Sequence, residues 1–72
     1  MMKIDSISQV IAKRRKSLGV SQVQLAKLAS VSSHTLSDIE SGSGNPTIGS
    51  LAKIADVLGM DLMLVVRGRL QD

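Results

Sequence analysis

The hydrophobic and polar positions of this chain follow the period of an α-helix in four separate stretches. The first spans Ser6–Leu18, where apolar residues recur at spacings of three and four. The other three span Gln22–Ala29, Ser33–Glu40 and Ile48–Leu58. We therefore expect four helices, each contributing one apolar stripe to a shared core.

Residues that start and stop helices flank these stretches. The expected N-caps are Ser6, Ser21, Ser32 and Thr47. Gln9 and Gln24 each stand three residues after a serine, which is the spacing of a capping box. Gly19 and Gly59 stand where a left-handed residue commonly ends a helix. The helix boundaries thus have support from cap chemistry as well as from periodicity.

The second stretch is short and has a small residue in its middle. Leu25, Leu28 and Ala29 are expected to form its buried stripe. Ala26 is small enough to let another helix approach closely. Only a few residues then separate this stretch from the third, so the two are expected to form a helix-turn-helix.

The third stretch has only two large apolar residues, Leu36 and Ile39, which are expected to hold it against its neighbour. The rest of its surface is short-chained and polar, and consists of Ser33, His34, Thr35, Ser37 and Asp38. A helix with such a face can enter a major groove about 12 Å wide and reach the base edges.

Two further segments follow. Ser41–Pro46 is rich in glycine and serine, and we interpret it as a loop between the third and fourth helices rather than as an interdomain linker. Residues 61–67 follow a helix stop and are rich in β-branched residues, so we expect a short strand. Both faces of that strand are apolar, through Leu62, Met63, Leu64, Val65 and Val66.

A lone apolar strand needs a partner. Pairing with the same strand of a second copy would close its edge and give a twofold homodimer. The alternative is that the segment extends the fourth helix or packs as a coil on its own domain. Residues 1–72 are then expected to form a single domain, all-α apart from this strand, with a helical core at 6–58 and a dimerisation strand at 61–67.

Composition excludes several classes of function. With no cysteine and the single histidine His34, the chain is not expected to bind a metal, and no cofactor is expected either. No pairing of a nucleophile with a base is apparent, so the chain is not expected to be an enzyme. No apolar run reaches the roughly 20 residues that span a bilayer, and no secretion signal is visible. We therefore expect a cytoplasmic protein without a membrane partner.

Charge points toward a polyanion. The net charge is +3, and residues 13–16 form a run of four basic side chains. The alternative interpretation is that these side chains only form a solvated helix face. For Lys16, and for Lys27 in the second stretch, that alternative is nearly as good as electrostatic attraction to the phosphates of a duplex. The absence of aromatic residues argues against single-stranded nucleic acid, whose bases stack on aromatic rings.

The second and third stretches together resemble the phage repressor and Cro family of helix-turn-helix proteins. The matching residues are Ser21-Gln22-x-x-Leu25-Ala26 and Val31-Ser32-x-x-Thr35-Leu36-Ser37-x-Ile39-Glu40-x-Gly42, within a resemblance from about Ile11 to Leu58. The resemblance implies that Arg15 and Glu40 form a structural ion pair. It also implies DNA contacts, or in the case of Gln22 a brace for the recognition helix, from Gln22, Ser32, Ser33, His34, Thr35 and Ser37.

Each of four candidate residues has two possible interpretations. His34 contacts a phosphate or a purine N7, or is only a surface residue. Asp38 accepts from cytosine N4, or points away or pairs with a nearby cation, which we favour because phosphates repel carboxylates. Asn45 and Thr47 precede the fourth helix, whose N-terminus suits a phosphate, and Thr47 can also serve as a plain cap.

The expected function is that of a homodimeric transcriptional repressor that binds a palindromic operator in double-stranded DNA. Its layout of four helices, Gly59 and then a strand resembles the HipB-type antitoxins. That resemblance implies a HipA-like toxin kinase as a further partner. The alternative function is a protein-interaction module, an antitoxin whose main role is to bind such a kinase.

Overall fold

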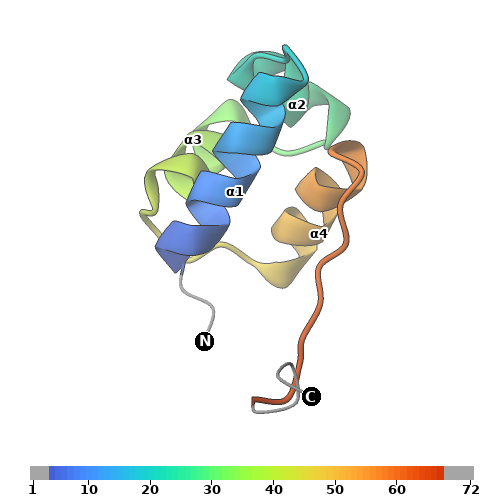
Figure 1. The fold of residues 1–72 in the computed structure, drawn as a ribbon. Helices are drawn as coiled ribbons and strands as arrows, with labels where there is room; N and C mark the ends of the chain where they lie inside the picture. The colour runs from blue at the N-terminus through green and yellow to red at the C-terminus, as the bar shows by residue number, and fades with distance from the viewer. Residues whose placement is uncertain (1–3, 68–72) are drawn as a thin grey trace.

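The computed structural model describes residues 4–67, which contain four α-helices (Figure 1). They are α1 (Ile4–Ser17), α2 (Gln22–Leu28), α3 (Ser33–Ser41) and α4 (Ile48–Val57). The predicted all-helical helix-turn-helix class is confirmed, with the predicted boundaries within two residues of those observed. In the part of the chain that the structure describes, no helix has the length and apolarity needed to cross a membrane.

Helix α1 begins earlier than predicted. It starts at Ile4, so Ser6 lies inside the helix and the capping box expected at Ser6 and Gln9 is wrong. The apolar spacing of the sequence continues back through Ile7 to Ile4, which extends the helical period beyond the expected cap.

The later N-caps are formed as the sequence predicted. The Ser21 hydroxyl accepts from the Gln24 amide at 3.1 Å, and the Ser21 amide donates to the Gln24 side chain at 2.9 Å, which completes a capping box. The hydroxyls of Ser32 and Thr47 each accept from the amide three residues later, both at 3.0 Å. These caps fix where α2, α3 and α4 begin.

The helices end in the same way, with a left-handed residue directly after the last turn. These residues are Gly19, Ser30, Gly42 and Gly59. Ser30 is the non-glycine member, with a φ of 57°. Its amide donates to the carbonyl of Lys27, and the Val31 amide donates to that of Ala26. This pair of hydrogen bonds makes the tight turn between α2 and α3.

The core lies between all four helices. Its buried apolar residues are Ile11, Leu25, Ala26, Ala29, Leu36, Ile39, Leu51, Ile54 and Leu58. Helices α1 and α2 pack against α3, and α2 also packs against α4. The position of α3 is therefore set by apolar contacts on its inner side.

Leu28 does not belong to this core, although the sequence pattern placed it there. Its side chain is 64% exposed, whereas Leu25, Ala26 and Ala29 are buried. At about 100° per residue, the centre of the stripe formed by Leu25, Ala26 and Ala29 lies close to Ala29, and Leu28 lies about 100° away from it. The buried stripe of α2 and its C-cap therefore contains Ala26 in place of the expected Leu28.

The strand predicted over residues 61–67 is not formed, because none of residues 4–67 lies in a strand. Instead the chain runs away from the helices after Met60 as a single segment (Figure 1). A strand exists through hydrogen bonds to a neighbouring strand, and residues 4–67 of one copy offer none. Leu64 is 96% exposed in this arrangement.

Candidate nucleic-acid interface

The outer side of α3 is a continuous polar surface. Leu36 and Ile39 fix the inner side in the core. On the outer side Ser33, His34 and Ser37 are exposed. No described part of the chain covers this side, so its hydroxyl and imidazole groups are open to a ligand.

The first turn of α3 commits some of its polar groups to the helix itself. The Ser32 hydroxyl accepts from the Thr35 amide at 3.0 Å and donates to Thr35 Oγ1 at 2.8 Å. Because a hydroxyl has one hydrogen, Ser32 has none left to donate, whereas Thr35 keeps its own. The early amides of α3 carry the positive end of the helix dipole, which favours a phosphate nearby.

Asp38 pairs with His34 along the outer side of α3. His34 Nε2 lies 3.3 Å from Asp38 Oδ2, and the two side chains are 88% and 43% exposed. Asp38 thus has a partner on its own helix, and its two interpretations, reading cytosine or pairing with a nearby cation, stay predictions. His34 is the more accessible of the two side chains.

A shallow pocket of about 120 Å³ joins α3 to the loop that follows it. Thr35 and Asp38 line it from the helix, and Asn45 and Pro46 line it from the loop. The structure thus brings Asn45 to the same side as Thr35 and Asp38. Thr47 lies just beyond, and its hydroxyl accepts from the Ser50 amide and donates to Ser50 Oγ at 2.9 Å, so it is occupied as a cap.

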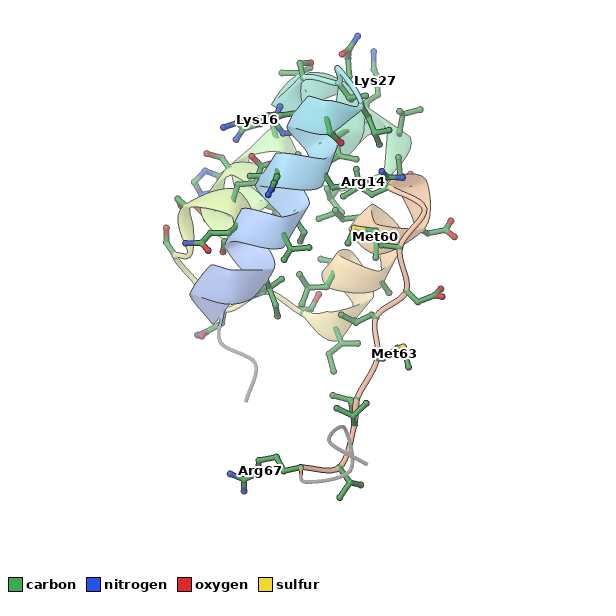
Figure 2. All side chains as sticks on the ribbon, viewed as in Figure 1. Arg14, Lys16, Lys27, Met60, Met63 and Arg67 are labelled. Carbon is green, nitrogen blue, oxygen red and sulfur yellow. The ribbon has the colours of Figure 1, made fainter. Side chains whose placement is uncertain are left out.

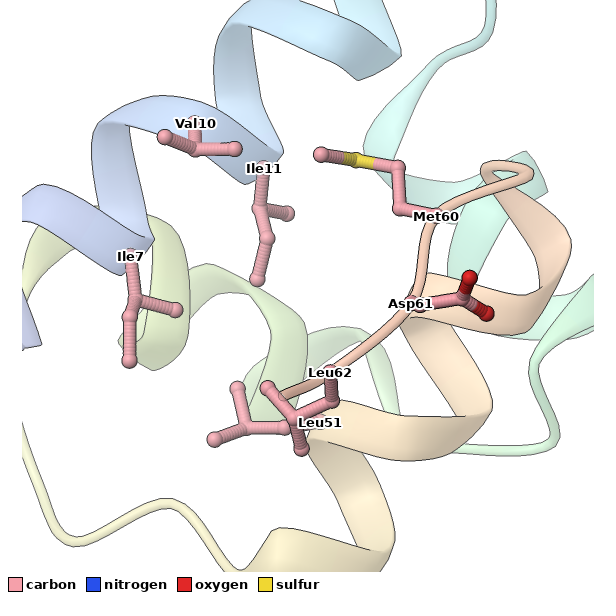
Figure 3. Close-up of a pocket in the computed structure, with 7 residues that line it drawn as sticks. All are labelled: Ile7, Val10, Ile11, Leu51, Met60, Asp61 and Leu62. Atoms are coloured by element: carbon pink, nitrogen blue, oxygen red, sulfur yellow. The ribbon is translucent and has the colours of Figure 1, made fainter. Parts of the chain in front are cut away.

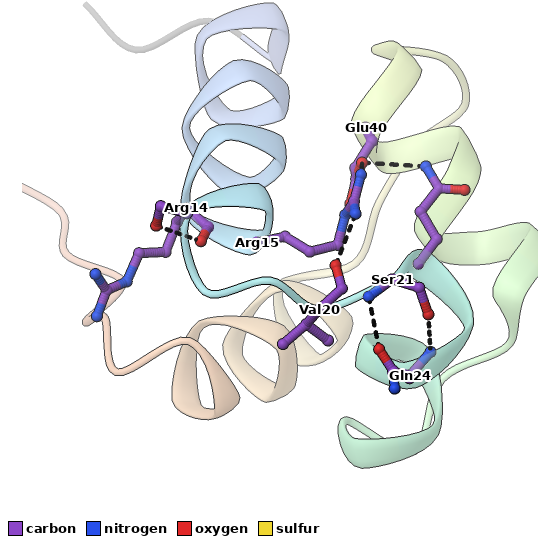
Figure 4. Close-up of polar contacts among 8 residues, drawn as sticks. Arg14, Arg15, Val20, Ser21, Gln24 and Glu40 are labelled. Atoms are coloured by element: carbon purple, nitrogen blue, oxygen red, sulfur yellow. Dashed lines mark hydrogen bonds and ion pairs between the residues drawn. The ribbon is translucent and has the colours of Figure 1, made fainter.

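Three polar side chains tie α3 to α1 and α2 (Figure 4). Arg15 Nε lies 2.7 Å from Glu40 Oε2, and Arg15 Nη2 lies 3.0 Å from Glu40 Oε1. Arg15 also donates to the carbonyl of Val20 at 2.8 Å. Gln22 Nε2 donates to Glu40 Oε1 at 3.1 Å. We call Arg15, Gln22 and Glu40 the brace.

The two ionisable side chains of the brace, Arg15 and Glu40, are both charged. Burial disfavours the charged form of Glu40, but hydrogen bonds from Arg15 and Gln22 and the charges of Arg15 and Lys16 outweigh it, so its pKa lies below the ordinary value. The hydrogen bond to Glu40 outweighs desolvation at Arg15 and raises the pKa of the guanidinium. The brace therefore holds the end of α3 with a charged pair rather than a neutral one.

Gln22 contributes to the brace and still has one amide hydrogen that a ligand could accept. Its side chain is half-buried and donates one amide hydrogen to Glu40. A primary amide has two such hydrogens, so one is left for a phosphate at the start of α2. The two roles implied for Gln22, bracing and phosphate contact, are therefore compatible.

The basic side chains of α1 and α2 have different surroundings. Arg14 Nε donates to the Leu58 carbonyl at 3.0 Å and so satisfies the end of α4. Sequence reasoning missed this role, since no local spacing links residues 44 positions apart. Lys16 and Lys27 are exposed at the end of the molecule formed by α1 and α2, whereas Arg14 lies toward α4 (Figure 2). The two lysines remain candidates for electrostatic contact, whereas Arg14 already uses one guanidinium nitrogen to hold the end of α4.

A second surface is apolar and lies beside α1 and α4. A groove of about 140 Å³ there is lined by Ile7, Val10, Ile11, Leu51, Met60, Asp61 and Leu62 (Figure 3). It continues into the segment of residues 62–66, whose side chains are all exposed. The residues expected to pair two copies thus form one segment, which begins at the groove with Leu62 and then runs away from the helices (Figure 1).

Comparison with known proteins adds two findings. The family model of helix-turn-helix proteins matches residues 11–64, which include the brace, α2, α3 and α4. The immunity repressor protein of Bacillus phage phi105 is 36% identical to this chain over 61 residues. The aligned stretch covers 85% of this chain and 42% of that repressor, so the chain spans less than half the length of this relative.

Proposed function

The chain belongs to the phage repressor and Cro family of helix-turn-helix proteins, and from this premise we propose that it binds a specific sequence in double-stranded DNA and represses transcription. The similar phage protein is an immunity repressor by name, and we transfer its repressor role to this chain as part of the proposal. We propose that the protein carries out this role in the cytoplasm.

One observation carries the proposal. Leu36 and Ile39 hold α3 from inside, while Ser33, His34 and Ser37 stand exposed on the opposite side. A helix presented in this way fits the major groove, where short polar side chains reach base edges and phosphates. The brace supports this use of α3, because it fixes the helix without using any group of the outer side.

We further propose that the protein acts as a homodimer joined through residues 62–66. This segment exposes five consecutive apolar side chains, which is unfavourable in water for a monomer. Pairing with the same segment of a second copy would bury them, supply the missing ladder of hydrogen bonds and close the edge. A twofold dimer of this kind requires a palindromic operator with half-sites about one turn apart, roughly 34 Å.

The antitoxin role stays a prediction. It depended on the resemblance to HipB-type proteins, and that resemblance included a C-terminal strand that residues 4–67 do not contain. No feature of the described residues favours a HipA-like kinase as partner over DNA. Recovery of a kinase with the tagged protein, from cells that carry both genes, would support the alternative function.

Selection from a random duplex library tests the main proposal. The wild-type protein is expected to enrich a palindrome, and a variant with Ser33→Ala and His34→Ala is expected to lose the preference at defined base pairs. Ser17→Ala is a matched control, because Ser17 is an exposed serine of α1 that donates only to the Arg14 carbonyl. Equal affinity of the wild-type protein for the selected palindrome and for random duplex would contradict sequence-specific repression.

Salt dependence gives an independent readout of phosphate contact. Each phosphate neutralised by a cation adds about 0.9 to the slope of log affinity against log salt. Lys16→Ala and Lys27→Ala are expected to lower that slope by about 1 each. Arg14→Ala is the matched control and is expected to leave the slope unchanged, since Arg14 holds the Leu58 carbonyl.

A further inference from the structure

We propose that Asp38 is a positioning residue that selects which ring nitrogen of His34 reads DNA. The inference rests on the proposed function and assigns a specificity to one part of its site. Its basis is the contact between His34 Nε2 and Asp38 Oδ2 at 3.3 Å on the outer side of α3. His34 and Asp38 are four residues apart, so they stand one helical turn from each other.

The contact favours one tautomer of a neutral imidazole. A carboxylate oxygen attracts a proton and repels a lone pair, so the ring nitrogen beside it is the one that carries the proton. At 3.3 Å the contact is an ion-pair distance rather than a hydrogen bond, and its electrostatics place the proton on Nε2 and leave a free lone pair on Nδ1. Among residues 4–67, no protein group hydrogen-bonds to Nδ1, which is therefore available to a ligand as an acceptor.

An acceptor at this position restricts what it can bind. Phosphate oxygens accept and do not donate, so they are excluded as partners of Nδ1. In the major groove the available donors are the exocyclic amino groups of cytosine N4 and adenine N6. The geometry thus points to an amino-bearing base opposite His34, and not to the phosphate or purine N7 that a donating histidine would contact.

The surrounding charges leave Asp38 as the partner of His34. Glu40, the other acid of α3, is engaged by Arg15 from α1 and by Gln22 from α2. No other ion pair to His34 occurs within the described residues. The Asp38 side chain in turn has no partner there besides His34, so its replacement leaves the brace and the core intact.

The test compares base preference across single variants by duplex selection at about pH 8.5, above the range in which histidines usually change charge. The wild-type protein is expected to prefer cytosine or adenine at one position of each half-site. Asp38→Ala is expected to weaken that preference by about 2- to 12-fold, the worth of one hydrogen bond, with the other positions unchanged. Asp38→Asn is expected to retain it, because the amide oxygen also accepts from Nε2–H.

The readout is a ratio between bases rather than an affinity. Removing a carboxylate raises the affinity for every duplex by reducing repulsion from phosphates, and a ratio cancels this uniform effect. His34→Ala must lose the preference at the same position. If His34→Ala keeps it while Asp38→Ala loses it, Asp38 reads the base itself and the inference is wrong. If Asp38→Ala changes no preference, Asp38 does not act on His34 in the complex.

The tautomer has its own measurement, which needs no DNA. His34 is the single histidine of the chain, so nitrogen NMR of the imidazole gives one spectrum without overlap. The wild-type protein is expected to carry the proton on Nε2, and Asp38→Ala to give a mixture of tautomers. An unchanged spectrum in Asp38→Ala would overturn the inference. A wild-type protein that selects no sequence at all would instead overturn the proposed function, and this inference with it.

Discussion

The guanidinium of Arg15 contacts both carboxylate oxygens of Glu40 and thereby joins the end of α1 to the end of α3. The two side chains are only 11% and 6% exposed, so solvent screens the pair little. Gln22 adds a third point of attachment from the start of α2. The orientation of α3 thus depends on the brace as well as on the buried residues Leu36 and Ile39.

Breaking the brace on one side is expected to be costly. Glu40→Ala leaves the part-buried Arg15 guanidinium without its counter-charge and with only its hydrogen bond to the Val20 carbonyl, which should lower the free energy of unfolding by about 1–3 kcal/mol. Urea denaturation followed by circular dichroism measures the change. The double variant Arg15→Met with Glu40→Leu is expected to recover most of the loss, because apolar side chains of similar size can replace a buried pair. A double variant as unstable as Glu40→Ala would show that the uncompensated charge is not the cause.

Acid is expected to weaken the fold through the same carboxyl group. The pKa of Glu40 lies below its ordinary value in the folded protein, so the folded state binds a proton less readily than the unfolded state does. Its contribution is therefore complete above the unfolded pKa of about 4.3 and is lost as the pH falls through the folded pKa. Urea denaturation at a series of pH values below about 5 should show this loss. Glu40→Gln is expected to flatten the dependence, and an equal slope in both proteins would exclude Glu40 as its source.

A stabilising change is expected at Ser30. Its φ of 57° costs an ordinary residue roughly 1–2 kcal/mol, and glycine avoids this cost at some expense in chain entropy. Ser30→Gly should therefore raise the free energy of unfolding by about 0.5–1 kcal/mol, measured by urea denaturation. Gly19→Ala is the matched control at another helix end. It is expected to lower stability through φ alone, because no atom lies within 4 Å of the added Cβ.

Local chemistry explains why much of this fold was predictable. Caps at Ser21, Ser32 and Thr47 involve atoms three residues apart, so the sequence shows both partners at once. The buried leucine and isoleucine of α3 likewise follow from the helical period. The polar outer side of α3 is the complement of that stripe, which is why the candidate site could be located without coordinates.

Features that depend on distant partners could not be obtained in this way. Nothing in the sequence pairs Arg14 with the Leu58 carbonyl, and the Arg15–Glu40 pair was expected from family resemblance rather than from spacing. Leu28 was misplaced because a seven-residue helix gives too few apolar positions to define the direction of its stripe. The strand expected over residues 61–67 requires a neighbouring strand, which the described part of a single copy does not provide.

The apolar segment provides the prediction that separates a dimer from a monomer. Leu64→Arg places a charge at its most exposed leucine, so it should leave the monomer folded. In a twofold pair the change occurs in both copies. Each leucine then forfeits about 1.5–3 kcal/mol of burial, so the dissociation constant of the dimer should rise at least about 100-fold. Sedimentation equilibrium over a range of concentrations measures this constant.

Leu28→Arg is the matched control, because Leu28 is also largely exposed but lies on α2, outside both the segment and the groove. It is expected to sediment like the wild-type protein. Leu64→Arg is also expected to bind an isolated half-site as the wild-type protein does, and to lose the added affinity of the full palindrome, since only a dimer contacts both halves. A wild-type protein that sediments as a monomer, both free and with a palindromic duplex, would contradict pairing through this segment.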